Sequence, residues 1–201
     1  MKYARKQLHV FQVVEQYEAL VKEFMLSKAI CHNLCFGQVS DYKKLEKFCD
    51  DIREEMKKSD GIVFREKSSQ SFTRPEERAL AHDAILTYQQ CNSRNKDLDM
   101  PITADELLFV CRRLKRNLQR CSQHKLYGEI YADRVYTALM MFSGGLFKIN
   151  RCNKCSWTFA VKMDSNTQSN CTNCFAIKKM RKTNVVARTS KESEVSELKT
   201  G

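Results

Sequence analysis

Apolar residues recur at helical spacing along the first part of the chain. From about Gln7 into the late twenties they fall on one face, at intervals of three and four residues: Val10, Val13, Val14, Tyr17, Val21 and Phe24. This spacing predicts an amphipathic helix with one apolar face. That face is wide enough to be either part of the core or a seam that holds a partner protein.

A second helical pattern follows a short break. Gly37 interrupts the apolar spacing, Ser40 can cap a new helix, and the spacing then returns at Tyr42, Leu45, Phe48, Cys49 and Ile52. Residues 29–56 therefore have the layout of a DNA-binding helix-turn-helix. Any αα-hairpin has the same layout, and the match to the DNA-binding version is poor position by position. Both interpretations stay open.

Three more helices are predicted before residue 145. Residues 57–73 are polar and predict a connecting loop, after which Thr73-Arg74-Pro75-Glu76 and later Thr103-Ala104-Asp105-Glu106 form capping boxes. The first box opens a helix with Ala81, Ile85 and Tyr88 on one face. The second opens a helix with the apolar stripe Leu107, Cys111, Leu114, Leu118 and Cys121. A last helix over 131–142 stops at Gly144-Gly145 and buries Tyr131, Val135, Leu139 and Phe142.

The C-terminal part differs in kind. The segments "LFKINRC" and "SWTFAVKM" are rich in β-formers, and residues 166–170 supply a turn. Residues 183–201 lack apolar periodicity and are expected to be disordered. The chain contains only six Gly and two Pro, which favours helices over sandwiches or barrels. We therefore predict a mainly α protein: a helical body at 1–145, a small β, ribbon-like region at 146–182, and a tail.

Composition also bears on where in the cell the protein is expected to work. The hydrophobic content of 42% supports a real core. Residues 1–7 are charged, but the stretch behind them is too polar for a signal peptide, and no apolar run approaches the ~18–20 residues that span a bilayer. We expect a cytoplasmic protein, in which cysteines stay reduced. We therefore expect its ten cysteines to be metal ligands or small buried hydrophobes rather than disulfides.

Four of these cysteines have the spacing of a metal site. Cys152, Cys155, Cys171 and Cys174 form C-x2-C-x15-C-x2-C, which is typical of one tetrahedral zinc ion. We expect a β-hairpin of about fifteen residues to bring the two pairs together. With all four ligands supplied by protein, the zinc is structural and not catalytic. A redox role for either pair is disfavoured, because a thioredoxin-like C-x-x-C needs a βαβ setting.

The remaining cysteines show weaker patterns. Cys31-His32-x2-Cys35 has the form of half a second metal site, but no matching half is nearby. Cys31 and Cys35 are one helical turn apart, which suits small buried hydrophobes. Cys49 and Cys91 show no partner in the sequence.

The formal net charge of +11 points to polyanions if the cations cluster. Two clusters stand out. One lies in and behind the cysteine region and contains Lys154, Lys162, Lys178, Lys179, Arg181 and Lys182. The other lies on the polar side of the predicted helix that begins at the Thr103–Glu106 capping box, and it contains Arg112, Arg113, Lys115, Arg116 and Arg120. Each is either a DNA-phosphate surface or a solvated face.

Catalytic signatures are missing from the sequence. We find no nucleophile–base pair, paired carboxylate site, phosphate-cradling Gly loop or open metal site, so we expect a protein that is not an enzyme. Two classes remain, a nucleic-acid-binding module and a structural assembly subunit, and one protein can be both.

One family shares several of these motifs. The run Arg134-x-Tyr136-Thr137, then Phe142, Gly145-Leu146, Cys152-Asn153-x-Cys155-x3-Phe159 and Cys171-x2-Cys174 resembles the FlhC family, the C subunit of the bacterial flagellar master transcriptional activator. The resemblance is specific over 126–178 and loose before it. It implies a helical body with a zinc region whose ligands are the four cysteines. It also implies work with a small D-like helical subunit, in a hetero-oligomer that binds double-stranded DNA and recruits σ70 RNA polymerase.

The sequence also departs from the flagellar members. The segment between the cysteine pairs lacks the Gly pair often found there, lysine is heavily used, and the tail differs. These departures fit a relative encoded on a conjugative plasmid or integrative element. We therefore expect an activator of flagellar or conjugative-transfer genes, with neither a membrane nor a small-molecule substrate. The alternatives are a stand-alone zinc-ribbon nucleic-acid-binding protein and a structural assembly subunit.

Overall fold

The protein is mainly helical, with one short hairpin near its C-terminal end. The computed structural model describes residues 9–62, 64, 72, 74–92, 98–120, 129–156, 158–163, 171 and 174. Their elements are η1 (Val10–Gln12), α1 (Val14–Phe24), α2 (Lys28–Cys35), α3 (Tyr42–Asp60), α4 (Pro75–Cys91), α5 (Ala104–Arg120), α6 (Ala132–Ser143), β1 (Phe147–Arg151) and β2 (Thr158–Lys162). The predicted fold class is confirmed. The predicted tail at 183–201 lies outside the described residues.

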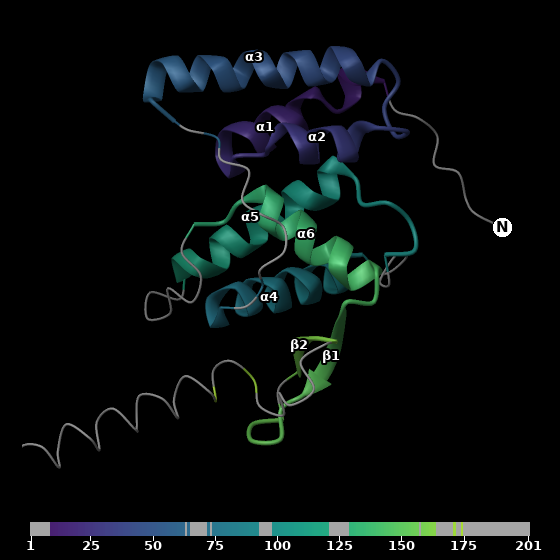
Figure 1. Ribbon diagram of the computed structural model, residues 1–201, viewed down its shortest axis with the longest axis vertical. Helices are drawn as coiled ribbons and strands as arrows, with labels where there is room; N and C mark the ends of the chain where they lie inside the picture. The colour runs from purple at the N-terminus through teal and green to yellow at the C-terminus, as the bar shows by residue number, and fades with distance from the viewer. Residues whose placement is uncertain are drawn as a thin grey trace, which may run out of the picture.

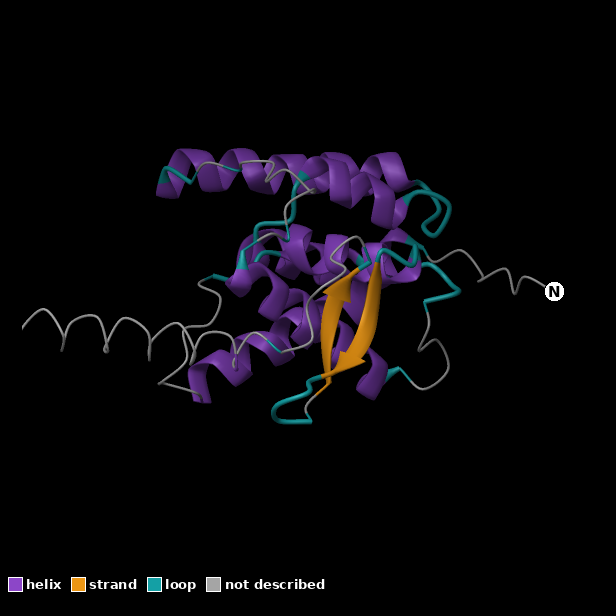
Figure 2. Ribbon diagram, turned by 60° about the horizontal axis from the view of Figure 1, so that its bottom comes forward, coloured by secondary structure: helices purple, strands orange, loops and turns teal. Residues whose placement is uncertain are grey.

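The helices form two layers, with the hairpin at one end (Figure 1). In the first layer α3 packs on α1 and α2, and in the second α4 packs on α5 and α6. The two layers meet where α1 contacts α5. The hairpin continues from α6 and packs its strands against α4 and α6. Figure 2 shows the two strands lying beside the helices.

The first predicted helix is in fact two helices. Met25 adopts a left-handed conformation with φ 56°, and its N–H donates to the carbonyl of Val21 at 3.1 Å, the hydrogen bond of the αL motif that ends a helix. Ser27 then caps α2, because its hydroxyl accepts from the N–H of Ile30 at 3.4 Å. The chain therefore turns in the mid-twenties, where we predicted continuous helix.

The apolar face of residues 10–24 is core. Val13, Tyr17, Val21 and Phe24 are at most 7% exposed, and Leu20 joins them at 0%. These side chains therefore belong to the core. Val10 and Val14 are half-buried and Phe11 is 90% exposed, so contact of this segment with a partner stays a prediction.

The second layer confirms the predicted stripes and shifts one helix start. In α5, Leu107, Cys111 and Leu114 are fully buried, while the side chains of Leu118 and Cys121, also part of the predicted stripe, lie outside the described part of the chain. Its capping box is in place: Thr103 N–H donates to Glu106 Oε2 at 2.8 Å, and Glu106 N–H donates to Thr103 Oγ1 at 3.3 Å. The predicted box at 73–76 is displaced by one residue. Arg74 is the N-cap of α4, and its N–H donates to Glu77, not Glu76, at 3.3 Å.

Two further expectations shift in detail. Helix α3 extends to Asp60, so the predicted loop from residue 57 begins later. In α6, Val135 and Leu139 are buried as predicted, while Tyr131 precedes the helix and is half-buried, as is Phe142. Both differences lie at helix ends, where the periodicity that defines a helix fades.

A buried carboxylate joins the two layers. Asp133, in the first turn of α6, is only 8% exposed, and its Oδ1 accepts from the backbone N–H of Ser27 at 2.9 Å. These residues lie 106 positions apart in the chain. Because Ser27 N–H is buried at the start of α2, losing this acceptor would leave a donor without a partner.

The hairpin has two apolar faces, and each belongs to a different core. Its strands pair antiparallel, with Ile149 opposite Ala160. Phe147 and Ala160 are buried in the core of the helices, where Phe147 meets Phe72 edge to face at 5.6 Å. Phe159 and Val161 point the other way, because successive strand residues alternate sides, and they pack with the cysteines.

Candidate metal centre

The first cysteine pair lies in the turn of the hairpin. Cys152 follows β1 directly and Cys155 shortly precedes β2. The turn is closed by the N–H of Ser156, which donates to the carbonyl of Cys152 at 2.9 Å. The Nε–H of Arg151 donates to the carbonyl of Ser156 at 3.0 Å. The hairpin is thus built around the first pair, whereas we predicted a hairpin between the two pairs.

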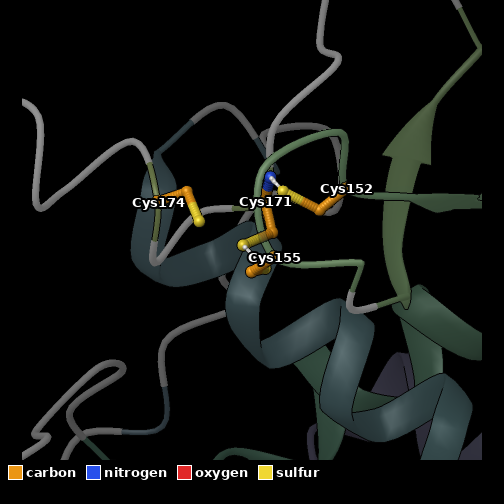
Figure 3. Close-up of side chains that lie close together, drawn as sticks. All are labelled: Cys152, Cys155, Cys171 and Cys174. Atoms are coloured by element: carbon orange, nitrogen blue, oxygen red, sulfur yellow. Dashed lines mark hydrogen bonds between the residues drawn. The ribbon is translucent and has the colours of Figure 1, made fainter.

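All four thiols converge on one point (Figure 3). The sulfur atoms of Cys152, Cys155, Cys171 and Cys174 lie within 4.8 Å of one another. Those of Cys155 and Cys171 are 3.5 Å apart. Zn–S bonds of about 2.3 Å in a tetrahedron place sulfur atoms about 3.8 Å apart. The cluster is therefore the right size for a metal ion with four thiolate ligands.

Backbone amides prepare one thiol for metal binding. Burial alone would raise the pKa of Cys152, but hydrogen bonds from the backbone N–H groups of Cys171, Cys155 and Lys154 lower it to about 6. The bond from Cys171 N–H to Cys152 Sγ measures 3.2 Å. Since metals bind the thiolate form, Cys152 is ready for coordination at neutral pH.

Two of the other thiols, those of Cys171 and Cys174, have raised pKa values. Hydrogen bonds to the thiols of Cys155 and Cys171 raise the pKa of Cys174 to about 12. Burial raises the pKa of Cys171. A bound cation replaces these protons, so metal binding at this site releases protons. All four ligands would come from the protein, so a metal ion bound here would have no position open for a substrate.

The structure divides the predicted cationic stripe of α5. Arg112 donates to Glu23 of α1 at 2.6 Å, and the Lys115 ammonium lies 5.4 Å from the ring centre of Phe24. Arg113 and Arg116 are exposed, and neither forms an ion pair with a described residue. Two of the predicted cations therefore help to join α5 to α1, and two face solvent without an acidic partner in the described part of the chain.

An exposed aromatic ring lies on the same face of α5. Phe109 is 45% exposed and precedes Arg113 by four residues and Arg116 by seven, which puts the three on one side of the helix. Sequence reasoning missed Phe109, although its place outside the apolar stripe was a signal of exposure.

The other candidate cations are placed only in part. Lys154 is exposed in the turn between Cys152 and Cys155. Arg120 is the last residue of α5 and Lys162 the last of β2. Lys178, Lys179, Arg181 and Lys182 lie outside the described residues.

Helices α2 and α3 occupy the region of the predicted helix-turn-helix, and they pack on each other. Acids balance the cations of α3 in number. Some of the cations near and on α3 also form ion pairs: Lys28 binds Asp50 at 2.7 Å, Lys57 binds Glu54 at 2.7 Å, and Lys44 binds Asp41 at 3.4 Å. A compensated face attracts phosphates weakly, so DNA recognition by α3 stays a prediction, and α5 is the better candidate.

No protein-family model matches the chain, and neither does any curated protein. The resemblance to the FlhC family therefore stays a prediction from the motifs quoted above. None of the helices in the described part of the chain combines the length and the apolar character needed to cross a membrane.

Proposed function

We propose that this protein is a DNA-binding subunit of a bacterial transcription activator, with one structural zinc ion in its cysteine cluster. The observation that carries the proposal is the α5 surface, defined as Phe109, Arg113 and Arg116. Its arginines are exposed and unpaired among the described residues, in a chain with a net charge of +11. Uncompensated arginines beside an aromatic ring are the chemistry that binds a phosphate backbone.

Zinc is the metal that the donor set favours. Four thiolates in two C-x2-C pairs form closed tetrahedral sites, and zinc takes such sites as a structural ion. Its part here is to fix the hairpin turn that exposes Lys154. Lys154 in that turn is a second, smaller candidate for phosphate contact. Further candidates near it in the sequence are Lys162, Lys178, Lys179, Arg181 and Lys182.

Phosphate contacts position a protein on DNA but carry no sequence information. We therefore assign promoter selection to an assembly. As the resemblance to the FlhC family implies, a small D-like subunit holds copies of this chain at a set spacing, and the complex recruits σ70 RNA polymerase at flagellar or conjugative-transfer promoters. The isolated chain then binds target and scrambled duplexes alike.

The salt dependence of DNA binding tests the α5 surface. We expect the zinc-loaded full chain to lose affinity steeply as salt rises, because each phosphate contact releases counterions. In the double variant Arg113→Gln, Arg116→Gln, the slope of log affinity against log salt should become about 1.8 less negative, since each contact contributes about 0.9. Fluorescence anisotropy with target and scrambled duplexes, titrated at several salt concentrations, measures it.

The matched control removes the same charge from a compensated face. Lys44→Gln with Lys57→Gln deletes two cations that pair with Asp41 and Glu54, and the slope should stay near that of the parent chain. Equal slopes for both double variants would show that total charge, not the α5 surface, drives binding. Strong preference of the isolated chain for the target duplex would overturn the assembly mechanism and favour a stand-alone reader.

A further inference from the structure

Three thiols outside the metal centre meet inside the helical core. Cys31 and Cys35 of α2 and Cys49 of α3 are each at most 1% exposed. The thiol of Cys31 contacts the thiols of both Cys35 and Cys49, and Cys35 Sγ also donates to the backbone carbonyl of His32 at 3.5 Å. In the sequence Cys49 showed no partner, because the contact depends on how α3 packs on α2.

A buried arginine borders this cluster. The Arg53 side chain is 6% exposed. Its Nε–H donates to the carbonyl of Leu26 at 3.0 Å, and its Nη1 donates to Asp50 at 2.7 Å. Its Nη2 is buried and has no hydrogen-bond partner among the described residues. The guanidinium is therefore incompletely paired in a place where unpaired charge is costly.

The one carboxylate at this arginine is shared. Asp50 Oδ2 also binds the ammonium of Lys28 at 2.7 Å, so a single negative charge serves two cations. A thiolate at Cys31 would supply the missing anion. The pKa values agree: hydrogen bonds from Cys35 and Cys49 lower the pKa of Cys31, and the Arg53 charge lowers it further. The pKa values of Cys35 and Cys49 are raised, first by their hydrogen bonds to Cys31.

We propose that Cys31, Cys49 and Arg53 form a peroxide-reactive dithiol site, in which Cys31 is the attacking thiolate and Cys49 the resolving thiol. The arrangement supplies the parts of such a site: one sulfur stabilised as an anion, a protonated sulfur in contact with it, and a fixed cation. The proposal is independent of the DNA-binding function.

Helix geometry selects Cys49 over Cys35 as the resolving residue. Side chains four apart on one helix have Cβ atoms about 5–6 Å apart, whereas a disulfide requires about 3.5–4.5 Å. A bond between Cys31 and Cys35 would therefore distort α2. Cys49 is on another helix, and the distance between helices can adjust without breaking either one.

The chemistry balances with hydrogen peroxide as the oxidant. The Cys31 thiolate attacks one peroxide oxygen, the O–O bond breaks, and Cys31 sulfenic acid and hydroxide form. The Cys49 thiol then attacks the sulfenic sulfur, the S–O bond breaks, and a disulfide and water form. Two electrons pass from the two sulfurs to peroxide. Peroxide is small enough to reach the buried sulfurs when the structure opens locally. Small openings of this kind do not admit larger thiol reagents.

Peptide mapping tests the proposal on the zinc-loaded full chain. After peroxide treatment, free thiols are blocked with N-ethylmaleimide under denaturing conditions and the chain is cleaved with trypsin. Cleavage at Lys28, Lys43, Lys47 and Arg53 separates Cys31 and Cys35, on 29–43, from Cys49, on 48–53. We expect these two peptides to be joined by a bond that dithiothreitol reverses. Zinc content is followed in parallel, so that oxidation of the metal centre is scored separately.

Cysteine variants assign the bond. Cys35→Ser should still form the joined peptides, and Cys31→Ser should lose them. A bond within 29–43, joined peptides that persist in Cys31→Ser, or thiols that stay free while peroxide releases zinc would each overturn the proposal.

Arg53 variants test the activating cation. Arg53→Met removes the charge and keeps an apolar stem, so closure of the disulfide at neutral pH should slow at least tenfold. Arg53→Lys retains a charge and should close faster than Arg53→Met. Circular dichroism shows which variants fold, and Arg53→Lys serves if Arg53→Met does not. A folded variant of either kind that closed at the parent rate at every pH would refute the role of Arg53.

Discussion

The two apolar cores of this protein are stabilised in different ways. The core of the helices contains side chains from α1 to α6, among them the large residues Tyr17, Phe24, Ile85 and Tyr88. The second core contains Cys152, Phe159, Val161 and Cys171, with Cys174 at its edge. Burying Phe159 and Val161 contributes about 1.5–3 kcal/mol each, whereas ordering one residue of backbone costs about 1–2 kcal/mol. Two buried side chains do not offset the cost of ordering this region, so we expect a bound metal ion to stabilise the second core.

The β1–β2 hairpin separates these two cores. One of its faces supplies Phe147 and Ala160 to the helices, and the other supplies Phe159 and Val161 to the cysteines. The predicted division of the chain at residue 145 therefore separates a strand from the core that it helps to build. The cysteine cluster is therefore attached to the helices through strands that the two cores share. The cores are adjacent, and they differ in what stabilises them.

The largest effect is expected from breaking the metal centre. Cys171→Ser should remove most of the roughly 10–16 kcal/mol that a four-thiolate zinc site contributes to local folding. Amide protection in β1 and β2 should fall, while most helical circular dichroism remains, because the helices have their own core. Hydrogen exchange and metal content measure the effect.

Cys91→Ser, at an exposed cysteine, is the matched control and should change neither. If Cys171→Ser instead lost helical signal in proportion to hairpin protection, the two cores would be a single cooperative unit.

The next effect is expected from a change in the hairpin that separates the two cores. Phe147→Ala should lower the free energy of unfolding by about 3–5 kcal/mol, as deletion of a buried ring does, and should also weaken metal retention, because β1 supports both cores. Denaturant unfolding and competition with a chelator measure the two effects. Leu146→Ala, at a neighbouring residue that is 51% exposed, should cost within about 0.5 kcal/mol. Unchanged metal retention in Phe147→Ala would mean that the cores are uncoupled.

The smallest effect is confined to the helices. Asp133→Ala should cost about 1–3 kcal/mol, because the buried N–H of Ser27 loses its acceptor. Asp133→Asn retains an acceptor oxygen and should cost less. Neither variant should change metal content. Equal destabilisation by both variants in denaturant unfolding would show that the negative charge of Asp133, and not its hydrogen bond, stabilises the junction.

Local patterns predicted much of this molecule. The stripe of Leu107, Cys111 and Leu114 fixed the buried face of α5, because helical periodicity repeats within each turn. The spacing of the four cysteines predicted their cluster, because two short turns and one ion define a nearly complete geometry. The capping box at Thr103 marked a helix start to the residue.

Non-local features escaped prediction. Periodicity showed which face of residues 10–24 is apolar, but it does not show what covers that face, and the cover is the chain's own α3 and α5. Met25 ends α1 in a conformation that glycine usually takes, so no glycine marked the end. The contact of Cys31 with Cys49 and Arg53 arises only when α2 packs on α3, which no local pattern encodes.

The bond between Ser27 and Asp133 has a consequence for synthesis of the chain. Ribosomes add about 5–20 residues per second, and 106 positions separate the two residues, so Ser27 waits roughly 5–20 s for its acceptor. During that time α1 has no α5 to pack against, and the surface around Phe24 that α5 later covers remains open to other chains. The first layer can thus be translated early, but its burial is completed only when α6 has left the ribosome.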